Sequence, residues 1–312
     1  MLCIFLYNRN GEMMLTITQV SKSYGEVQAL KDLSLTVQPG EIFGLLGLNG
    51  AGKTTTFRMI MNLFNPDQGE ILFDGSLIGY EHMDRVGFLS EDRSLMTKMT
   101  VKEQMIFYGR LKGMSKKAAL EAMHYWLDRF SIQEYESRKI KELSKGNQQK
   151  IQFITAIMND PDLLILDEPF NGLDPFNVQV FIDVIREFQA RGKAIIFSSH
   201  QMHHIEQFCE SMTLLKSGRA IVSGNIQKIK EELKQKNIFV RAELDLDFIR
   251  RLDGVKEVVQ HADSTEIKIT DESYVHHVFE AVKLAPNVTL FDVRLPSLQE
   301  VFIAKVGEAY EE

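Results

Sequence analysis

The chain has 312 residues, which is enough for about two domains and a substantial hydrophobic core. Its hydrophobic fraction of 44% and charged fraction of 25% are those of an ordinary soluble globular protein, and a formal net charge of −7 gives no general basic surface for nucleic acid. The cysteines, Cys3 and Cys209, form no C-x-x-C pair, so the sequence indicates neither a disulfide framework nor a zinc ribbon, and a reducing cytoplasm fits best.

The first segment, 1–13, is expected to be a disordered or artefactual start. Residues 1–7 are apolar but too few to cross a bilayer, and they lack the positively charged flank and the small-residue cleavage pattern of a signal peptide. Elsewhere no apolar stretch approaches the ~20 residues that a membrane span needs. Met13 or Met14 could equally be the initiator, because a predicted strand over 15–17 follows directly.

The most informative stretch, 47–54, matches the phosphate-binding pattern G-x-x-x-x-G-K-[ST] in full. Glycines let the backbone curl with its N–H groups pointing at a phosphate, which a side chain would block. Lys53 supplies a charge for the β- and γ-phosphates, and the Thr54 hydroxyl can bind Mg²⁺ at the start of a helix whose dipole attracts the anion. An apolar strand over 42–46 and a helical pattern over 55–64 flank the loop, as the motif requires. The predicted nucleotide-binding residues of this stretch are Gly47, Leu48, Asn49, Gly50, Ala51, Gly52, Lys53, Thr54 and Thr55.

A second apolar run, 163–166, ends in two acids, Asp167 and Glu168. Such a run is typical of a central parallel strand whose carboxyl end faces a bound ligand. At that end Asp167 can hold Mg²⁺ through water, and Glu168 can polarise an attacking water molecule. The alternative is a buried strand followed by two surface acids, and the phosphate loop upstream argues against it.

Further short motifs accompany these in a fixed order. They are Lys22-Ser23-Tyr24-Gly25, Leu143-Ser144-Lys145-Gly146-Asn147-Gln148-Gln149-Lys150, Phe170-Asn171-Gly172-Leu173-Asp174 and Ser198-Ser199-His200. With them the chain resembles the ATP-binding subunits of ABC transporters over roughly 15–224. The second motif looks like the family signature L-S-G-G-Q, the third like its D-loop, and the fourth ends like its switch-histidine strand. The resemblance implies ATP and Mg²⁺ as cofactors, with Tyr24 stacking on adenine and His200 reaching the γ-phosphate.

Three positions depart from the family pattern. The family usually has glutamine at the position of Glu91, in the loop that links the ATP site to the membrane partner, and Glu91 keeps a ligand for Mg²⁺ or water but adds a charge. In the signature, Lys145 replaces glycine and Asn147 replaces glutamine. A lysine at a helix N-terminus attracts phosphate together with the helix dipole. These changes indicate either a variant subfamily or a decayed signature that no longer supports hydrolysis.

The resemblance also implies a shared active site. Two subunits pair head to tail, so that Ser144 and Gly146 of one cover the γ-phosphate that Lys53 of the other holds, and ATP keeps the homodimer closed. Glu168 and His200, with Lys53 and Mg²⁺, form the implied catalytic set, because phosphoryl transfer needs positioning and charge neutralisation.

Hydrolysis then opens the dimer and drives a separate membrane permease, with export the expected direction. The subunit is accordingly expected in the cytoplasm, on the inner face of the cell membrane, and nucleic acid is not an expected partner. The implied ligands of Mg²⁺ are Thr54, Asp167 and Glu91.

The expected fold is an α/β P-loop NTPase domain of the ABC ATPase type over 14–225, with a helical subdomain at about 92–150. Residues 226–237 are lysine-rich and are expected to form a linker or a solvated helix. The rest, 238–312, is predicted to be a small α+β domain of ferredoxin-like β-α-β-β-α-β order, followed by a final helix. It resembles the C-terminal extension of bacterial drug- and ion-export ABC ATPases. Helices are predicted at 101–112, 116–130, 246–252 and 274–284, and strands at 238–244, 256–261, 266–269 and 288–294.

Other functions remain open at this stage. A soluble ABC ATPase that acts on ribosomes or DNA usually carries two cassettes or a long insertion, whereas this chain has a single cassette. A regulatory module that binds ATP without hydrolysing it is the second alternative, suggested by Lys145 and Asn147. A GTPase is disfavoured because no N-K-x-D motif occurs. His200, His203 and His204 have the i, i+3, i+4 spacing of metal ligands, but no acid or cysteine clearly completes a ligand set.

Overall fold

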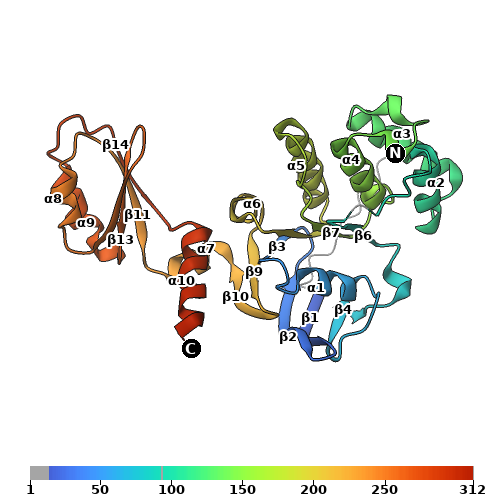
Figure 1. Cartoon of the computed structure of the whole chain (residues 1–312), viewed down its shortest axis with the longest axis horizontal. Coiled ribbons are helices and arrows are strands. Elements are labelled where there is room, and N and C mark those ends of the chain that lie inside the picture. Colours follow the sequence, from blue (N-terminus) through green and yellow to red (C-terminus); the bar gives the residue numbers. More distant parts are fainter. Residues whose placement is uncertain (1–13, 93, 312) are drawn as a thin grey trace. The chain divides into compact units, whose positions relative to one another are not determined.

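The computed structural model describes residues 14–92 and 94–311, so the start expected at 1–13 lies outside the described residues. The chain divides into two compact units, Met1–Ser223 and Gly224–Glu312 (Figure 1). We call them the N-terminal and C-terminal units. The last strand of the N-terminal sheet, β10, runs across the division and ends at Asn225.

A six-stranded sheet forms the centre of the N-terminal unit, in the order β10-β9-β3-β8-β7-β6. The pairs β9 with β3, β3 with β8, β8 with β7 and β7 with β6 are parallel. Every residue of β3, β7 and β8 is buried, which explains their unbroken apolar runs. The strands of this sheet are β3 (Ile42–Gly47), β6 (Val86–Leu89), β7 (Leu163–Asp167), β8 (Ala194–Ser199), β9 (Ser211–Lys216) and β10 (Arg219–Asn225).

A second sheet of the N-terminal unit has the strand order β2-β1-β4-β5. Each pair of neighbouring strands in it is antiparallel. Buried and exposed residues alternate along the second half of β2, as they do in a sheet with one solvated face. The strands are β1 (Leu15–Tyr24), β2 (Val27–Val37), β4 (Gln68–Phe73) and β5 (Ser76–Leu77).

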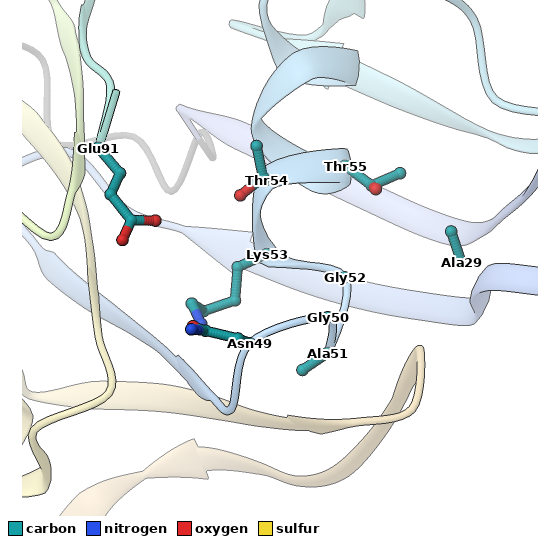
Figure 2. A pocket seen from close by; sticks show the side chains of 9 residues that line it. All are labelled: Ala29, Asn49, Gly50, Ala51, Gly52, Lys53, Thr54, Thr55 and Glu91. Atoms are coloured by element: carbon teal, nitrogen blue, oxygen red, sulfur yellow. The ribbon is translucent and has the colours of Figure 1, made fainter. Parts of the chain in front are cut away.

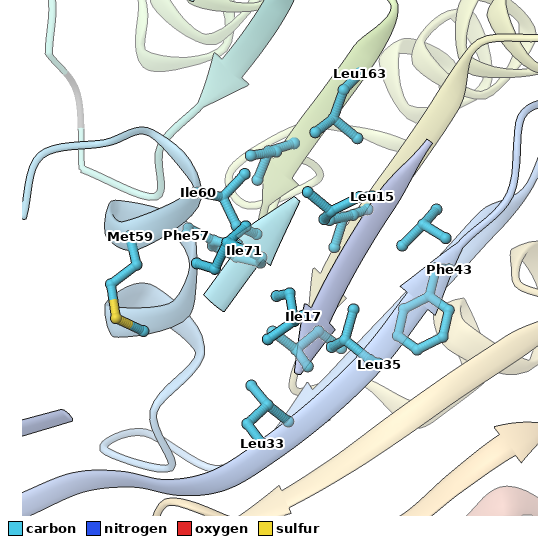
Figure 3. Packing of buried hydrophobic residues seen from close by; sticks show 14 of the residues in the cluster. Leu15, Ile17, Leu33, Leu35, Phe43, Phe57, Met59, Ile60, Ile71 and Leu163 are labelled. Atoms are coloured by element: carbon cyan, nitrogen blue, oxygen red, sulfur yellow. The ribbon is translucent and has the colours of Figure 1, made fainter. Parts of the chain in front are cut away.

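The main hydrophobic core lies between these two sheets and the helix α1 (Lys53–Ile60). Leu15 and Ile17 of β1 meet Phe57 and Ile60 of α1 in this core, and Leu163 of β7 belongs to the same cluster (Figure 3). Figure 1 shows α5 on the opposite side of the six-stranded sheet from α1. Burial on both faces fixes the sheet, and therefore the loops at its carboxyl edge.

Helices α2, α3 and α5 of the N-terminal unit begin at side-chain caps. Thr100 starts α2 with a capping box to Glu103, Ser115 caps α3, and Asp174 followed by Pro175 starts α5. The helices expected at 101–112 and 116–130 are confirmed as α2 and α3. The bounds are α2 (Val101–Leu111), α3 (Lys116–Arg129), α4 (Lys145–Ile157), α5 (Pro175–Ala190) and α6 (Met202–Phe208), with 3-10 turns at Tyr80–His82, Gln133–Tyr135 and Ile140–Glu142.

The C-terminal unit has a four-stranded antiparallel sheet in the order β12-β13-β11-β14. With α8 after β11 and α9 after β13, this is the expected β-α-β-β-α-β order. Its own core contains Ile238, Ile267 and Val278. The elements are α7 (Ile226–Glu232), β11 (Lys236–Arg241), α8 (Leu246–Arg250), β12 (Val255–Gln260), β13 (Thr265–Ile269), α9 (Val275–Val282), β14 (Leu290–Arg294) and α10 (Leu298–Glu311), with a 3-10 turn at Glu272–Tyr274.

The segment expected as a linker or solvated helix, 226–237, contains a helix and the start of a strand. Asn225 caps α7 by accepting the backbone N–H of Lys228, and Ile226 and Ile229 are buried. Strand β11 begins two residues earlier than predicted, because Lys236 pairs with Ile269 across the sheet. The lysine-rich segment therefore includes a helix that packs through Ile226 and Ile229. Within 14–92 and 94–311, none of the helices combines the length and the apolar character needed to cross a membrane.

Candidate functional site

The phosphate-binding motif joins strand β3 to helix α1. Gly50 has a φ of 79° and Gly52 a φ of 109°, so both positions take backbone conformations that side chains disfavour. Lys53 is only 7% exposed, and its Nζ donates hydrogen bonds to the carbonyl oxygens of Gly47 at 2.6 Å and Leu48 at 3.3 Å. An ammonium group has three donors, so one remains for an anion held in the loop.

A cavity of about 220 Å³ opens at this loop. Figure 2 shows the start of α1 beside it, with Lys53 and Glu91 extending from different segments. Backbone N–H groups at a helix N-terminus and a lysine are the features that hold phosphate groups. The lining residues are Ala29, Asn49, Gly50, Ala51, Gly52, Lys53, Thr54, Thr55 and Glu91.

Asp167 is the last residue of β7 and is 2% exposed. Ser198 on the neighbouring strand β8 donates its hydroxyl to Asp167 Oδ1 at 2.5 Å. Burial raises the pKa of the Asp167 carboxyl, and the charges of Glu91 and Glu168 raise it further, while Ser198 and Lys53 act in the opposite direction. Asp167 is therefore close enough to Glu91 and Lys53 to interact with both of them electrostatically.

These oxygen donors fit Mg²⁺. That ion is usually held by one or two carboxylates together with phosphate oxygens and waters, and Asp167, Glu91 and the Thr54 hydroxyl are donors of this kind. A divalent cation would also favour the ionised form of the buried Asp167 carboxyl. In the part of the chain that the structure describes, no cluster of three or more His, Cys, Asp or Glu side chains is arranged to hold a metal ion by itself.

Glu168 follows β7 in a left-handed conformation, with a φ of 50°, and is 5% exposed. Its Oε1 accepts the backbone N–H of His200 at 2.7 Å and lies 2.7 Å from His200 Nδ1. Its Oε2 accepts the Ser199 hydroxyl at 3.3 Å. The carboxylate is thus held in one orientation at the carboxyl edge of the sheet, next to Asp167, while the His200 side chain remains 46% exposed.

The histidines after β8 contact one another and aromatic side chains. The ring centroids of His203 and His204 are 4.1 Å apart, and Phe170 lies 5.0 Å from His204. Burial lowers the pKa of His204 to about 4, and the neighbouring His203 and His200 contribute to this shift. His204 therefore packs as a neutral ring among aromatic side chains.

Several predicted residues lie outside the cavity lining: Gly47 and Leu48 of the loop, the acids Asp167 and Glu168 with His200, and Tyr24 and the signature residues. Tyr24, at the end of β1, is 47% exposed and meets Phe64 edge to face at 5.8 Å, which leaves ring surface for a base to stack on. Ser144 caps α4 by accepting the Asn147 backbone N–H at 3.3 Å, and it is exposed, as is the neighbouring Lys145. The structure does not bring Ser144 and Gly146 into the cavity with Lys53 of the same chain.

Several side chains that position the site could not be identified from the sequence. Ser198 and Ser199 hold the two acids, and Gln149 of α4 donates its Nε2 to the Pro169 carbonyl oxygen at 3.2 Å, directly after Glu168. Ala29 lines the cavity from β2. The two serines belong to the motif Ser198-Ser199-His200, but their partners depend on the adjacency of β7 and β8, which no local pattern reveals.

Two family models match the chain. One, described as ABC transporter, matches residues 30–171, and the other, described as ATP-binding protein DrrA1-3-like, C-terminal domain, matches residues 224–306. The first match lies within the expected ATPase cassette, 14–225, and the second overlaps most of the expected C-terminal extension, 238–312.

Similar proteins support the same assignment. The uncharacterized ABC transporter ATP-binding protein YhaQ of Bacillus subtilis is 42% identical over 298 residues, which is 96% of this chain and 100% of that protein. The linearmycin resistance ATP-binding protein LnrL of Bacillus subtilis is 32% identical over 92% of this chain and 94% of its own length. A solved ATP-binding subunit of an ABC transporter superposes with a TM-score of 0.67 at 30% identity, over 70% of this chain and 92% of that structure. From these matches, the chain belongs to the family of ABC transporter ATP-binding proteins.

Proposed function

We propose that the chain hydrolyses ATP as one half of a head-to-tail homodimer and thereby powers export through a separate membrane permease. In its family, ATPase cassettes form dimers and act with membrane permeases. The finer assignments rest on the residues described above: ATP and Mg²⁺ bind at the cavity, and the chemistry takes place at the carboxyl edge of the parallel sheet.

The observation that carries the proposal is the orientation of the Glu168 carboxylate. It accepts two hydrogen bonds at 2.7 Å and 3.3 Å from His200 N and Ser199 Oγ, and His200 Nδ1 lies 2.7 Å away. A carboxylate fixed in this way beside Asp167 is suited to orient and deprotonate a water molecule that attacks the γ-phosphate. Lys53 would neutralise charge on the phosphates, and bound Mg²⁺ would supply further charge neutralisation through Asp167, Thr54 and Glu91.

The exposed start of α4 supports the dimer. Ser144 is exposed and the signature glycine, Gly146, is half-buried, so this helix N-terminus is accessible to an anion that a second copy carries. Neither residue lines the cavity of its own chain, which supports a site that a second copy completes. We expect each of the two sites to combine Lys53 of one subunit with Ser144 and Gly146 of the other.

Export is favoured by the relatives. LnrL is described as a linearmycin resistance protein, and other relatives are described as Nod factor export ATP-binding proteins. With the C-terminal domain of the DrrA1-3 type, these descriptions favour outward transport through a membrane permease, with this subunit bound to it at the cytoplasmic face. The cargo is expected to be recognised by the permease.

The test is the substitution Glu168→Gln. It preserves the size of the side chain and removes the base, so turnover should fall by about 10²–10⁴ while ATP affinity is retained. The variant should also accumulate as an ATP-bound dimer in size-exclusion chromatography with Mg²⁺. Glu121→Gln, on the exposed surface of α3, is a matched control and should hydrolyse ATP like the wild type.

Two outcomes would contradict the proposal. Near-normal phosphate release by Glu168→Gln would show that another group is the base. A wild-type protein that binds ATP and releases no phosphate would favour the regulatory module, for which Lys145 and Asn147 in the signature provide a sequence basis.

A further inference from the structure

Gln152 is a buried amide in the middle of the signature helix α4. The side chain is 4% exposed, and its neighbours in the sequence, Ile151 and Phe153, are fully buried. A primary amide in such surroundings is costly unless its polar atoms are hydrogen-bonded. Among the described residues Gln152 Oε1 has no hydrogen-bond partner, so the contacts of its Nε2 are those that explain a glutamine in this apolar segment.

The amide nitrogen of Gln152 binds both residues that flank Glu91. Nε2 lies 2.9 Å from the Ser90 carbonyl oxygen, 3.1 Å from Ser90 Oγ and 3.2 Å from the Asp92 carbonyl oxygen. A primary amide has two hydrogens, so at least one of them is shared between acceptors. Ser90 Oγ also donates to the Asp92 carbonyl oxygen at 2.7 Å, which closes the turn around Glu91.

Glu91 itself extends from this turn to the phosphate cavity, which it lines together with Lys53 and Thr54. The backbone on both sides of Glu91 is held by α4, whereas the Glu91 side chain is exposed. The position of Glu91 in the cavity thus depends on a helix that lies outside the cavity.

We propose that Gln152 is a positioning residue that couples the signature helix to Glu91, an inference that rests on the proposed function. The same helix begins at Ser144, which would contact the γ-phosphate bound to a second copy. Ser144 and Gln152 are eight residues apart, which is about 12 Å along a helix axis. A rigid helix of this length transmits a shift at its N-terminus to the turn around Glu91. Each ATP site would in this way respond to the nucleotide in the other.

Gln104 provides a matched control for burial. It is a second buried glutamine, 0% exposed, on helix α2, and its Oε1 accepts the Met96 backbone N–H at 2.8 Å. Met96 lies beyond the turn that surrounds Glu91. Replacing Gln104 removes a buried hydrogen bond of similar kind without releasing Ser90 or Asp92.

The experiment is a double-mutant cycle on the full chain. Gln152→Met and Gln104→Met are each made in the wild type and in Glu91→Ala, and kcat and KM for ATP are measured. Gln152→Met should lower kcat by between about 10-fold and 100-fold, the range that a misplaced active-site group produces, with KM changed by less than about threefold. In the Glu91→Ala background it should change kcat by less than about twofold, because its effect acts through Glu91.

Gln104→Met should change kcat by the same small factor in both backgrounds. Ser90→Ala removes one acceptor from the turn and serves if Gln152→Met does not fold; it should show a smaller loss with the same dependence on Glu91. The proposal would be overturned if Gln152→Met or Ser90→Ala lowered kcat by the same factor in the wild type and in Glu91→Ala. A dependence on Glu91 that Gln104→Met reproduces would do the same.

The proposal and the proposed function can fail separately. If the wild type binds ATP but does not hydrolyse it, the proposed function is wrong. The same double-mutant cycle is then run by calorimetry, and the measured quantity is the increase in ATP affinity when Mg²⁺ is added. Gln152→Met should then reduce that gain in the wild type and leave it unchanged in Glu91→Ala. A reduction of equal size in both backgrounds would overturn the coupling even in a chain without ATPase activity.

Discussion

Glycine is required at position 52 for two separate reasons, and at position 50 for only one of them. Gly50 has a φ of 79°, and a Cβ built on it would meet nothing within 4 Å. Gly52 has a φ of 109°, and its Cβ would lie 2.7 Å from Leu30 Cδ2 and 2.8 Å from the Ala29 carbonyl oxygen. The Gly50→Ala and Gly52→Ala variants therefore separate backbone strain from steric overlap.

The expected magnitudes follow from these two terms. Gly50→Ala should cost about 1–2 kcal/mol, the penalty for a left-handed residue with a side chain. Gly52→Ala should cost about 1–3 kcal/mol for its backbone conformation and a further ~1–3 kcal/mol for overlap with the backbone oxygen of Ala29, which cannot move aside as a flexible side chain could. The free energy of unfolding should therefore fall further for Gly52→Ala than for Gly50→Ala, by about 1–4 kcal/mol.

The assay is urea unfolding without nucleotide, followed by the fluorescence of Trp126. This is the single tryptophan of the sequence, and it lies buried in helix α3 of the N-terminal unit, so the signal reports on the unit that contains the loop. The midpoint should fall in the order wild type, Gly50→Ala, Gly52→Ala with an unchanged slope. Equal midpoints for the two variants would refute the steric argument, and a wild-type midpoint for both would refute the backbone argument as well.

The shared active site and the link to the permease provide two further predictions. Lys53→Ala and Ser144→Arg homodimers should each be nearly inactive, and mixing them should restore part of the activity, because each heterodimer has one intact site; full activity of Ser144→Arg alone would contradict the head-to-tail arrangement. Glu91→Ala should leave ATP affinity within about tenfold and should reduce permease-stimulated ATPase activity in lipid much further, since the coupling between two sites is typically worth ~1–3 kcal/mol; equal stimulation of variant and wild type would remove Glu91 from the coupling path.

The phosphate loop could be predicted from sequence because its geometry is local. Two glycines with positive φ, a lysine and a helix start are all encoded within eight residues, and the strand and the helix around them have clear periodicity. The same holds for the C-terminal unit, whose six central elements follow in the expected order. The observed bounds of an element differ from the predicted ones where strand pairing determines them. Lys236, for example, joins the sheet although the local sequence is typical of a linker.

The hydrogen bonds that hold Asp167 and Glu168 could not be predicted from the sequence in the same way. Ser198 and Asp167 are 31 residues apart in sequence and meet only because β8 pairs with β7, so the hydrogen bond depends on strand order. Gln152 is 62 residues from Ser90, and a helical pattern reveals that it is a polar residue on an apolar face but not which segment it binds. Polar residues inside apolar stretches are the signal that could have drawn attention to these positions.

The buried charge of Asp167 makes the stability of the protein depend on pH and Mg²⁺. Its pKa is raised in the folded state, mainly by burial, so the folded protein holds this proton more tightly than the unfolded chain does. Stability should therefore decrease as the pH rises from the unfolded-state pKa through the raised folded-state pKa, and the penalty should remain at neutral pH. Asp67 is the opposite case, because its hydrogen bond from Lys22 and that from the Ser23 backbone lower its pKa.

Without nucleotide and Mg²⁺, Asp167→Asn should therefore raise the melting temperature at neutral pH, because the amide keeps an acceptor for Ser198 and carries no buried charge. Its advantage over the wild type should disappear as the pH falls and the wild-type carboxyl takes up a proton. Asp67→Asn should lower the melting temperature at neutral pH and approach the wild type in acid. With Mg²⁺ and ATP present the order for Asp167 should reverse, since the wild type gains binding energy that the amide cannot match. A melting temperature of Asp167→Asn below that of the wild type at neutral pH without Mg²⁺ would show that Lys53 and Ser198 outweigh burial at this carboxyl.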